Sequence, residues 1–144
     1  MDPDMLFHAA SRLAMLGWLA LALSPLAPRA TQAVATTVPL VLSAGYAALI
    51  LVSWAGAPGG FGSLADVMRL FTAPTVALAG WVHYLAFDLL VGAWEARTAR
   101  REGLPHVLLL PCLVLTFLFG PAGLLLFLSI RAARQTVLPR ELEA

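Results

Sequence analysis

The sequence has few charged side chains and few reactive ones. Only 12% of its 144 residues are charged, none of them is lysine, and it has one cysteine and three histidines. A soluble domain is about 25% charged, so the composition excludes an ordinary soluble enzyme. The single Cys112 excludes an internal disulfide and a cysteine-based zinc cluster. A net charge of +1 gives no electrostatic attraction for nucleic acid, and we predict no nucleic-acid partner.

Long apolar segments make up most of the chain, which is 60% hydrophobic. A transmembrane helix needs about 20 apolar residues, and proline and glycine clusters separate four such segments. We therefore predict an all-α membrane protein, one integral domain over residues 1–144. The four transmembrane helices are expected at residues 5–23, 33–54, 73–94 and 108–130, before a polar tail at 131–144. The acidic opening Met1-Asp2-Pro3-Asp4 does not favour a cleaved signal peptide.

A short amphipathic segment at residues 63–71 lies between the second and third predicted spans. Ser63 is a candidate N-cap, with Asp66 three residues later. Leu64, Val67 and Phe71 follow at helical spacing on one face. This pattern predicts an interfacial helix that lies on the membrane.

The distribution of arginines does not determine the orientation of the four predicted spans in the membrane. One side of the membrane would hold Arg69, Arg131, Arg134 and Arg140, and the other Arg29, Arg97, Arg100 and Arg101. Since the positive-inside rule compares these two sets, equal numbers leave the orientation open. Arg12, inside the first span, either extends to the lipid headgroups or faces a polar bundle interior.

The third predicted span contains an unusual polar cluster. Asp88 follows Trp81 by seven residues and precedes Glu95 by seven, so the three share a helix face, which Tyr84 nearly joins. His83 lies on a different stripe of the same helix. Ionisable groups at this depth mark a functional site or lock neighbouring helices together, and both interpretations stay open.

The fourth predicted span has a proline, Pro121, near its centre. Proline has no N–H, so the Phe117 carbonyl loses its helical partner and needs another donor within the membrane. We predict that this break, His83 and Asp88 converge on one cleft, with Tyr84 as one candidate donor. The alternatives are a packing kink and a bond from Thr116 within its own helix.

The loop before the fourth predicted span is basic, with Arg97, Arg100, Arg101 and His106. It is either a solvated loop attracted to lipid phosphates or a polar lid over the cleft. The two closest histidines, His83 and His106, are 23 residues apart (106 − 83), which does not fit the paired histidines of a membrane metal centre. We predict neither a metal nor a cofactor, and we interpret Cys112 as a small buried apolar side chain.

Several motifs resemble the abscisic-acid-deficient-four-like family of small multi-helix membrane proteins. They are Trp81-Val82-His83-Tyr84-Leu85-Ala86-Phe87-Asp88-Leu89, Pro105-His106, Leu110-Pro111-Cys112-Leu113 and Gly120-Pro121-Ala122-Gly123-Leu124. Members occur in bacteria and plastids, and the plant members are required for making neoxanthin from violaxanthin. The resemblance implies a carotenoid or related isoprenoid as the ligand, and the arginine-, alanine- and leucine-rich composition suggests a bacterial inner membrane.

The resemblance implies a redox-neutral isomerase that converts an epoxide to an allenic alcohol. That reaction needs an acid at the epoxide oxygen and a base at a nearby C–H, and we assign Asp88 as the acid and His83 as the base, or the reverse. Trp81, Tyr84, His106, Arg97, Arg101 and Pro121 are the candidate substrate-binding residues. The alternatives are a non-catalytic membrane subunit or lipid chaperone, which binds a lipid or presents it to a partner enzyme, and a small transporter, which would need a homo-oligomer.

Overall fold

The computed structural model describes residues 2–141, with side-chain surroundings through Gln135, and every regular element in that range is helical. The elements are α1 (Pro3–Ala22), α2 (Pro28–Ser53), the 3-10 helix η1 (Trp54–Gly56), α3 (Leu64–Leu70), α4 (Pro74–Arg101), α5 (His106–Phe119) and α6 (Pro121–Glu141). The predicted all-α fold is confirmed over this range. Residues 142–144 of the predicted polar tail lie outside the described residues.

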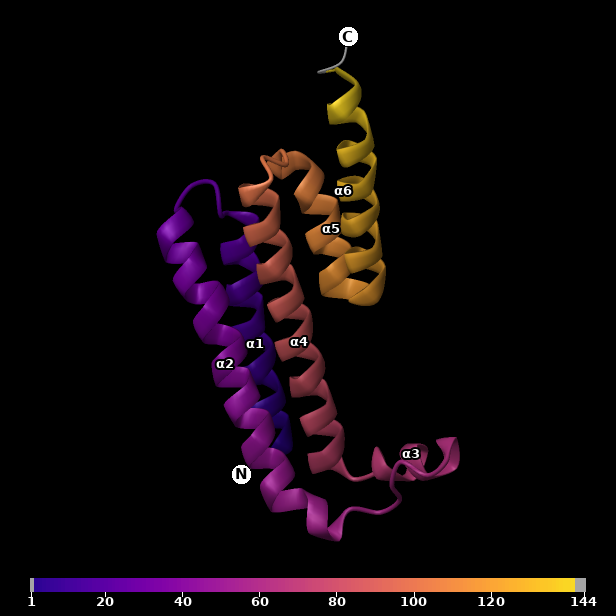
Figure 1. Ribbon diagram of the computed structural model, residues 1–144. Helices are drawn as coiled ribbons and strands as arrows, with labels where there is room; N and C mark the ends of the chain where they lie inside the picture. Colours follow the sequence, from indigo (N-terminus) through magenta and orange to yellow (C-terminus); the bar gives the residue numbers. More distant parts are fainter. Residues whose placement is uncertain (1, 142–144) are drawn as a thin grey trace.

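Helices α1, α2 and α4 lie side by side and form the body of the molecule (Figure 1). Each is long and apolar enough to cross a membrane. At 1.5 Å per residue, the 28 residues of α4 extend for about 42 Å. Helix α2 begins at Pro28 and not at residue 33, and α4 continues to Arg101 past the predicted end at residue 94. Three of the four predicted spans are therefore present.

Small residues let α1 and α4 approach each other closely. A Cβ on Gly17 of α1 would lie 2.4 Å from Leu89, and one on Gly92 of α4 would lie 2.7 Å from the ring of Trp18. Leu89 is fully buried and Trp18 is 8% exposed. In lipid there is no hydrophobic driving force for apolar helices to associate. Close van der Waals packing of this kind is therefore a main source of helix–helix attraction in membranes.

The continuous fourth helix predicted over residues 108–130 is not present. Helix α5 ends at Phe119, the chain turns at Gly120, and α6 runs back antiparallel along α5 (Figure 1). Gly120 has φ +32°, a conformation that side chains disfavour, and Pro121 begins the next helix, where a missing N–H costs nothing. With 14 residues, α5 is only about 21 Å long and ends partway along α4.

Helix α3 leaves the bundle sideways at the end where α2 finishes and α4 begins (Figure 1). Its predicted N-cap is confirmed: Ser63 Oγ accepts from the Asp66 N–H at 3.1 Å and donates to the Asp66 carboxylate at 2.7 Å. Hydrogen bonds from Arg69 and Ser63 hold the pKa of Asp66 below its usual value. Leu64 and Met68 are exposed, and the interfacial placement of this helix remains a prediction.

The turn at Gly120 changes which arginines share an end of the molecule. Because α6 returns alongside α5, its C-terminal half lies at the same end as the α4–α5 loop (Figure 1). Arg131 of α6 makes a two-pronged ion pair with Glu102 of that loop, and this contact lowers the pKa of Glu102. The arginines at this end are Arg29, Arg97, Arg100, Arg101, Arg131, Arg134 and Arg140, against Arg69 at the other end.

This uneven distribution favours one orientation in the membrane. Cytoplasmic loops carry the excess of positive charge, so the end with the α4–α5 loop is expected to be cytoplasmic and the α3 end external. Arg12 of α1 has an exposed side chain, which agrees with a side chain that extends towards the headgroups and not with one that faces the bundle interior.

Candidate functional site

One face of α4 meets the α5–α6 hairpin. Its polar residues are Tyr84, Asp88 and Glu95, the set that sequence spacing places together, and each contacts or approaches a different part of the hairpin. The hairpin thus places its turn, with the backbone groups that the turn frees, against the polar side chains of α4.

The Tyr84 hydroxyl satisfies the carbonyl that Pro121 leaves without a helical partner. It donates to Phe117 O at 3.0 Å, and Leu118 O lies 3.3 Å away. The expected need for an outside donor is met in this way, and Thr116 does not bond back within its own helix but donates to Glu95. A buried carbonyl left unpaired would cost about 1–3 kcal/mol, so Tyr84 stabilises the hairpin turn.

Asp88 lies directly beside the turn. A Cβ added to Gly120 would lie 2.6 Å from Asp88 Oδ1, so only glycine leaves space for this carboxyl group. The other oxygen, Oδ2, is buried and has no hydrogen-bond partner among the described residues. The Tyr84 hydroxyl also interacts with this carboxyl group. Because buried polar atoms are nearly always paired, Oδ2 is a candidate contact for a ligand.

Glu95 is fully buried further along the same face. Its two carboxyl oxygens lie 3.0 and 3.1 Å from Thr116 Oγ1 of α5. Glu95 lies one residue past the predicted end of the third span at residue 94, where burial is not expected. The signal for burial was its seven-residue spacing from Asp88, which places both on the face that the hairpin covers.

Aromatic side chains continue this face beyond the hairpin turn. The Phe7 and Trp81 rings are 5.4 Å apart between centroids, the Trp81 and Tyr84 rings 5.3 Å, and Trp81 Nε1 donates to Ser11 Oγ at 3.0 Å. Phe7 and Trp81 are each 37% exposed. We call Phe7, Trp81 and Tyr84 the aromatic face, and it leads from the lipid-exposed side of α1 and α4 to Asp88.

His83 lies outside this group. Its side chain is exposed, and its ring stacks on Phe87 at 4.6 Å and packs 5.3 Å from Tyr46 of α2. Tyr84, Asp88 and the turn before Pro121 come together as expected, but His83 does not join them. A side chain on a different stripe of α4 is not positioned to share a small reacting group with Asp88.

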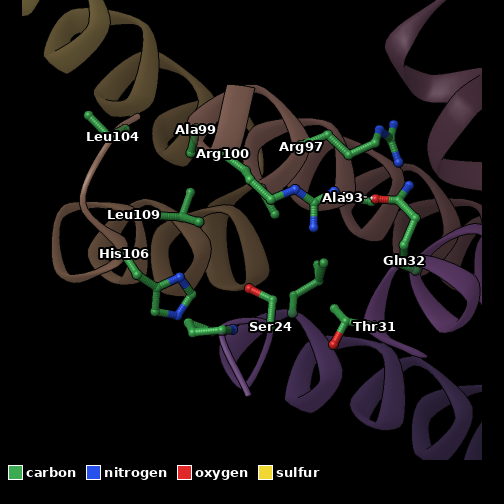
Figure 2. A pocket seen from close by; sticks show the side chains of 14 residues that line it. Ser24, Thr31, Gln32, Ala93, Arg97, Ala99, Arg100, Leu104, His106 and Leu109 are labelled. Atoms are coloured by element: carbon green, nitrogen blue, oxygen red, sulfur yellow. Dashed lines mark hydrogen bonds between the residues drawn. The ribbon is translucent and has the colours of Figure 1, made fainter. Parts of the chain in front are cut away.

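The basic residues of the α4–α5 region separate into two sets. Arg97, Arg100 and His106 line a pocket at the arginine-rich end of the bundle (Figure 2). His106 Nε2 donates to Ala22 O at 2.8 Å, and Arg100 donates to Gln32 Oε1 at 2.8 Å. Arg101 is exposed and is not part of the pocket lining.

The part of the chain that the structure describes has no group of three or more His, Cys, Asp or Glu side chains that would hold a metal ion. Cys112 is fully buried, and its Sγ donates to Leu108 O at 3.4 Å. It is thus positioned as a packing residue.

These features define a small helical membrane protein with three long apolar helices and a helical hairpin that ends beside a partly buried aspartate. The model of one protein family, described as ABA DEFICIENT 4-like, matches residues 5–127. The chain belongs to this family, as its motifs predicted. No curated protein and no solved structure matches it.

Proposed function

We propose that the chain binds a carotenoid or related isoprenoid along the aromatic face and isomerises its oxygen-bearing end at Asp88, in the inner membrane of a bacterium. Family membership is consistent with a carotenoid-related membrane protein. The observation that carries the proposal is the buried, unpaired Oδ2 of Asp88 at the inner end of the aromatic face.

The aromatic face suits a long apolar ligand with a polar end. Its exposed rings, Phe7 and Trp81, offer flat apolar surfaces to a polyene within the lipid. A ligand that lies along them reaches Tyr84 and Asp88, where its oxygen meets polar groups in a largely apolar surface. Few hydrogen-bonding groups amid apolar surface are typical of sites that orient a small molecule.

The donors and acceptors around Asp88 suit an acid role. The Tyr84 hydroxyl donates to the Phe117 carbonyl at 3.0 Å and also interacts with the Asp88 carboxyl. These two contacts hold the Asp88 carboxyl beside the turn, from where its proton is delivered to a ligand oxygen. The hydrogen-bonded Tyr84 also fixes the turn against which Asp88 lies.

A single carboxyl group is able to complete the isomerisation. When it protonates an epoxide oxygen, a C–O bond breaks and a carboxylate remains. That carboxylate then removes a proton from a nearby carbon, its C–H electrons form the new double bond, and Asp88 regains its proton. Oxygen gains the proton that carbon loses, so no oxidant or reductant is needed. This cycle does not require His83 as the base.

A second function is favoured by an apolar cavity of about 520 Å³ between α1, α2 and α4. Its lining includes Leu6, Leu42, Leu78 and Val82, with Thr75 the one side chain that bears a hydroxyl. Such a cavity holds an acyl or isoprenoid chain without chemistry. A lipid-binding subunit that serves a partner enzyme would use this cavity and not the aromatic face.

The bound lipid distinguishes the two functions. Protein purified in mild detergent and extracted with organic solvent is expected to yield an isoprenoid by mass spectrometry. We expect Trp81→Leu to lose most of it, because Trp81 forms the middle of the aromatic face. Trp54→Leu is the matched control, since Trp54 is similarly exposed at 44% but stacks on Phe61 at the α3 end. Equal retention by both variants would place the ligand in the cavity and contradict the proposed site.

A further inference from the structure

The pocket at the arginine-rich end of the bundle has an apolar floor and a basic rim. It has a volume of about 160 Å³ and lies where α1 ends, α2 and α5 begin and α4 ends. Leu21, Ala35 and Leu109 are among its apolar residues. Figure 2 shows Arg97 and Arg100 from α4 on the side of Gln32, with His106 of α5 on the opposite side.

The two arginines of this pocket have no acidic partner. The ion pairs found among the described residues are Arg69–Asp66 and Arg131–Glu102, so Glu102, the nearest acid in sequence to Arg100, is already engaged. Glu95 is buried against Thr116. Arg100 donates to the neutral Gln32, which leaves the positive charge of both guanidinium groups uncompensated.

Two guanidinium groups without an ion-pair partner, at one small pocket, are suited to bind a phosphate group. The planar fork of arginine donates two hydrogen bonds at a time to phosphate oxygens. A volume of about 160 Å³ is smaller than the roughly 300–1,000 Å³ of a pocket for a whole drug-sized ligand, so the pocket accommodates a headgroup and not a chain. The apolar floor suits the carbon side of a phosphate ester.

The position of the pocket is also appropriate for this ligand. It lies at the end with seven arginines, the end that the positive-inside rule places in the cytoplasm, where the anionic lipids of the leaflet attract basic segments. Arg97 follows Asp88 by nine residues, about 13.5 Å along α4, so the two sites are separate. We propose that this pocket binds the phosphate group of an anionic membrane lipid.

Binding of phosphatidic acid to the detergent-purified protein, measured by native mass spectrometry, tests the proposal. We expect Arg97→Gln/Arg100→Gln to lower the affinity at least tenfold. The control Arg29→Gln/Arg101→Gln removes the same charge from exposed positions at the same end and is expected to change it less than threefold. Because the charge variants lose the bond to Gln32, Ala96→Leu, which fills the pocket and keeps every charge, provides a second variant and should also lower the affinity tenfold.

Competition identifies the source of the phosphate group. If 10 mM inorganic phosphate displaces the lipid, the pocket recognises phosphate itself; if it does not, the pocket needs the esterified headgroup, and either result supports a phosphate site. Equal losses in the pocket and control variants, or full binding by Ala96→Leu, would show attraction to surface charge alone and overturn the proposal. Asp88→Asn is expected to keep phosphatidic acid binding, so this test is independent of the isomerase proposal.

Discussion

Asp88→Asn is expected to abolish isomerisation of an epoxy-carotenoid by the protein in lipid vesicles and to leave the fold intact. Asparagine has the size of aspartate but does not deliver an acid proton, and positioned acids contribute about 10²–10⁴-fold to such reactions. The turn should survive because Tyr84, and not Asp88, binds the Phe117 carbonyl. Violaxanthin is the test substrate that the family resemblance suggests, with the allenic product measured by chromatography.

His83→Gln is the matched control for Asp88→Asn. It replaces another polar residue of α4, five positions away, whose side chain is exposed and stacks on Phe87. We expect its activity to stay within threefold of the wild type. Loss of activity in His83→Gln with full activity in Asp88→Asn would contradict the assignment of the site to the aromatic face.

Gly120→Ala is expected to destabilise the hairpin turn. A side chain at positive φ costs about 1–2 kcal/mol, and the new Cβ would lie 2.6 Å from Asp88 Oδ1, which adds about 1–3 kcal/mol of overpacking. Thermal unfolding in detergent measures the sum. Gly103→Ala is the control, because Gly103 has φ +64° but nothing within 4 Å of its added Cβ.

The double variant Gly120→Ala/Asp88→Ala isolates the contact between the turn and α4. Asp88→Ala removes the oxygen that the new methyl group would meet, so part of the loss should be recovered in a double-mutant cycle. If the two losses simply add, or if Gly103→Ala is as destabilising as Gly120→Ala, Asp88 does not lie against the turn.

The sequence was sufficient for the three long helices and for the polar face of α4. Charge-free length and proline positions define α1, α2 and α4, because the hydrocarbon core has a fixed thickness. The Ser63 cap follows from local hydrogen bonding, and the grouping of Tyr84, Asp88 and Glu95 follows from helical periodicity alone. Each of these features depends on near neighbours in the chain or on the membrane.

The hairpin was not predictable from the same evidence. An apolar run of 23 residues, from 108 to 130, is compatible with one membrane span and also with two shorter antiparallel helices. The choice depends on distant partners: Tyr84 for the Phe117 carbonyl, Glu95 for Thr116, and space beside Asp88 for Gly120. The local signal was Gly120 followed by Pro121, which is typical of one helix ending and another beginning, but we interpreted it as a break within one continuous span.

The topology of α6 tests the central claim most directly, because the candidate site exists only if α5 and α6 form a hairpin. Single cysteines at Arg69, Arg101 and Gln135, in a Cys112→Ala background, would be labelled with an impermeant thiol reagent in intact cells and in inverted vesicles. The hairpin predicts that positions 101 and 135 label from the cytoplasmic side and position 69 from outside. Labelling of position 135 from the same side as position 69, opposite to position 101, would show a fourth span and contradict the site.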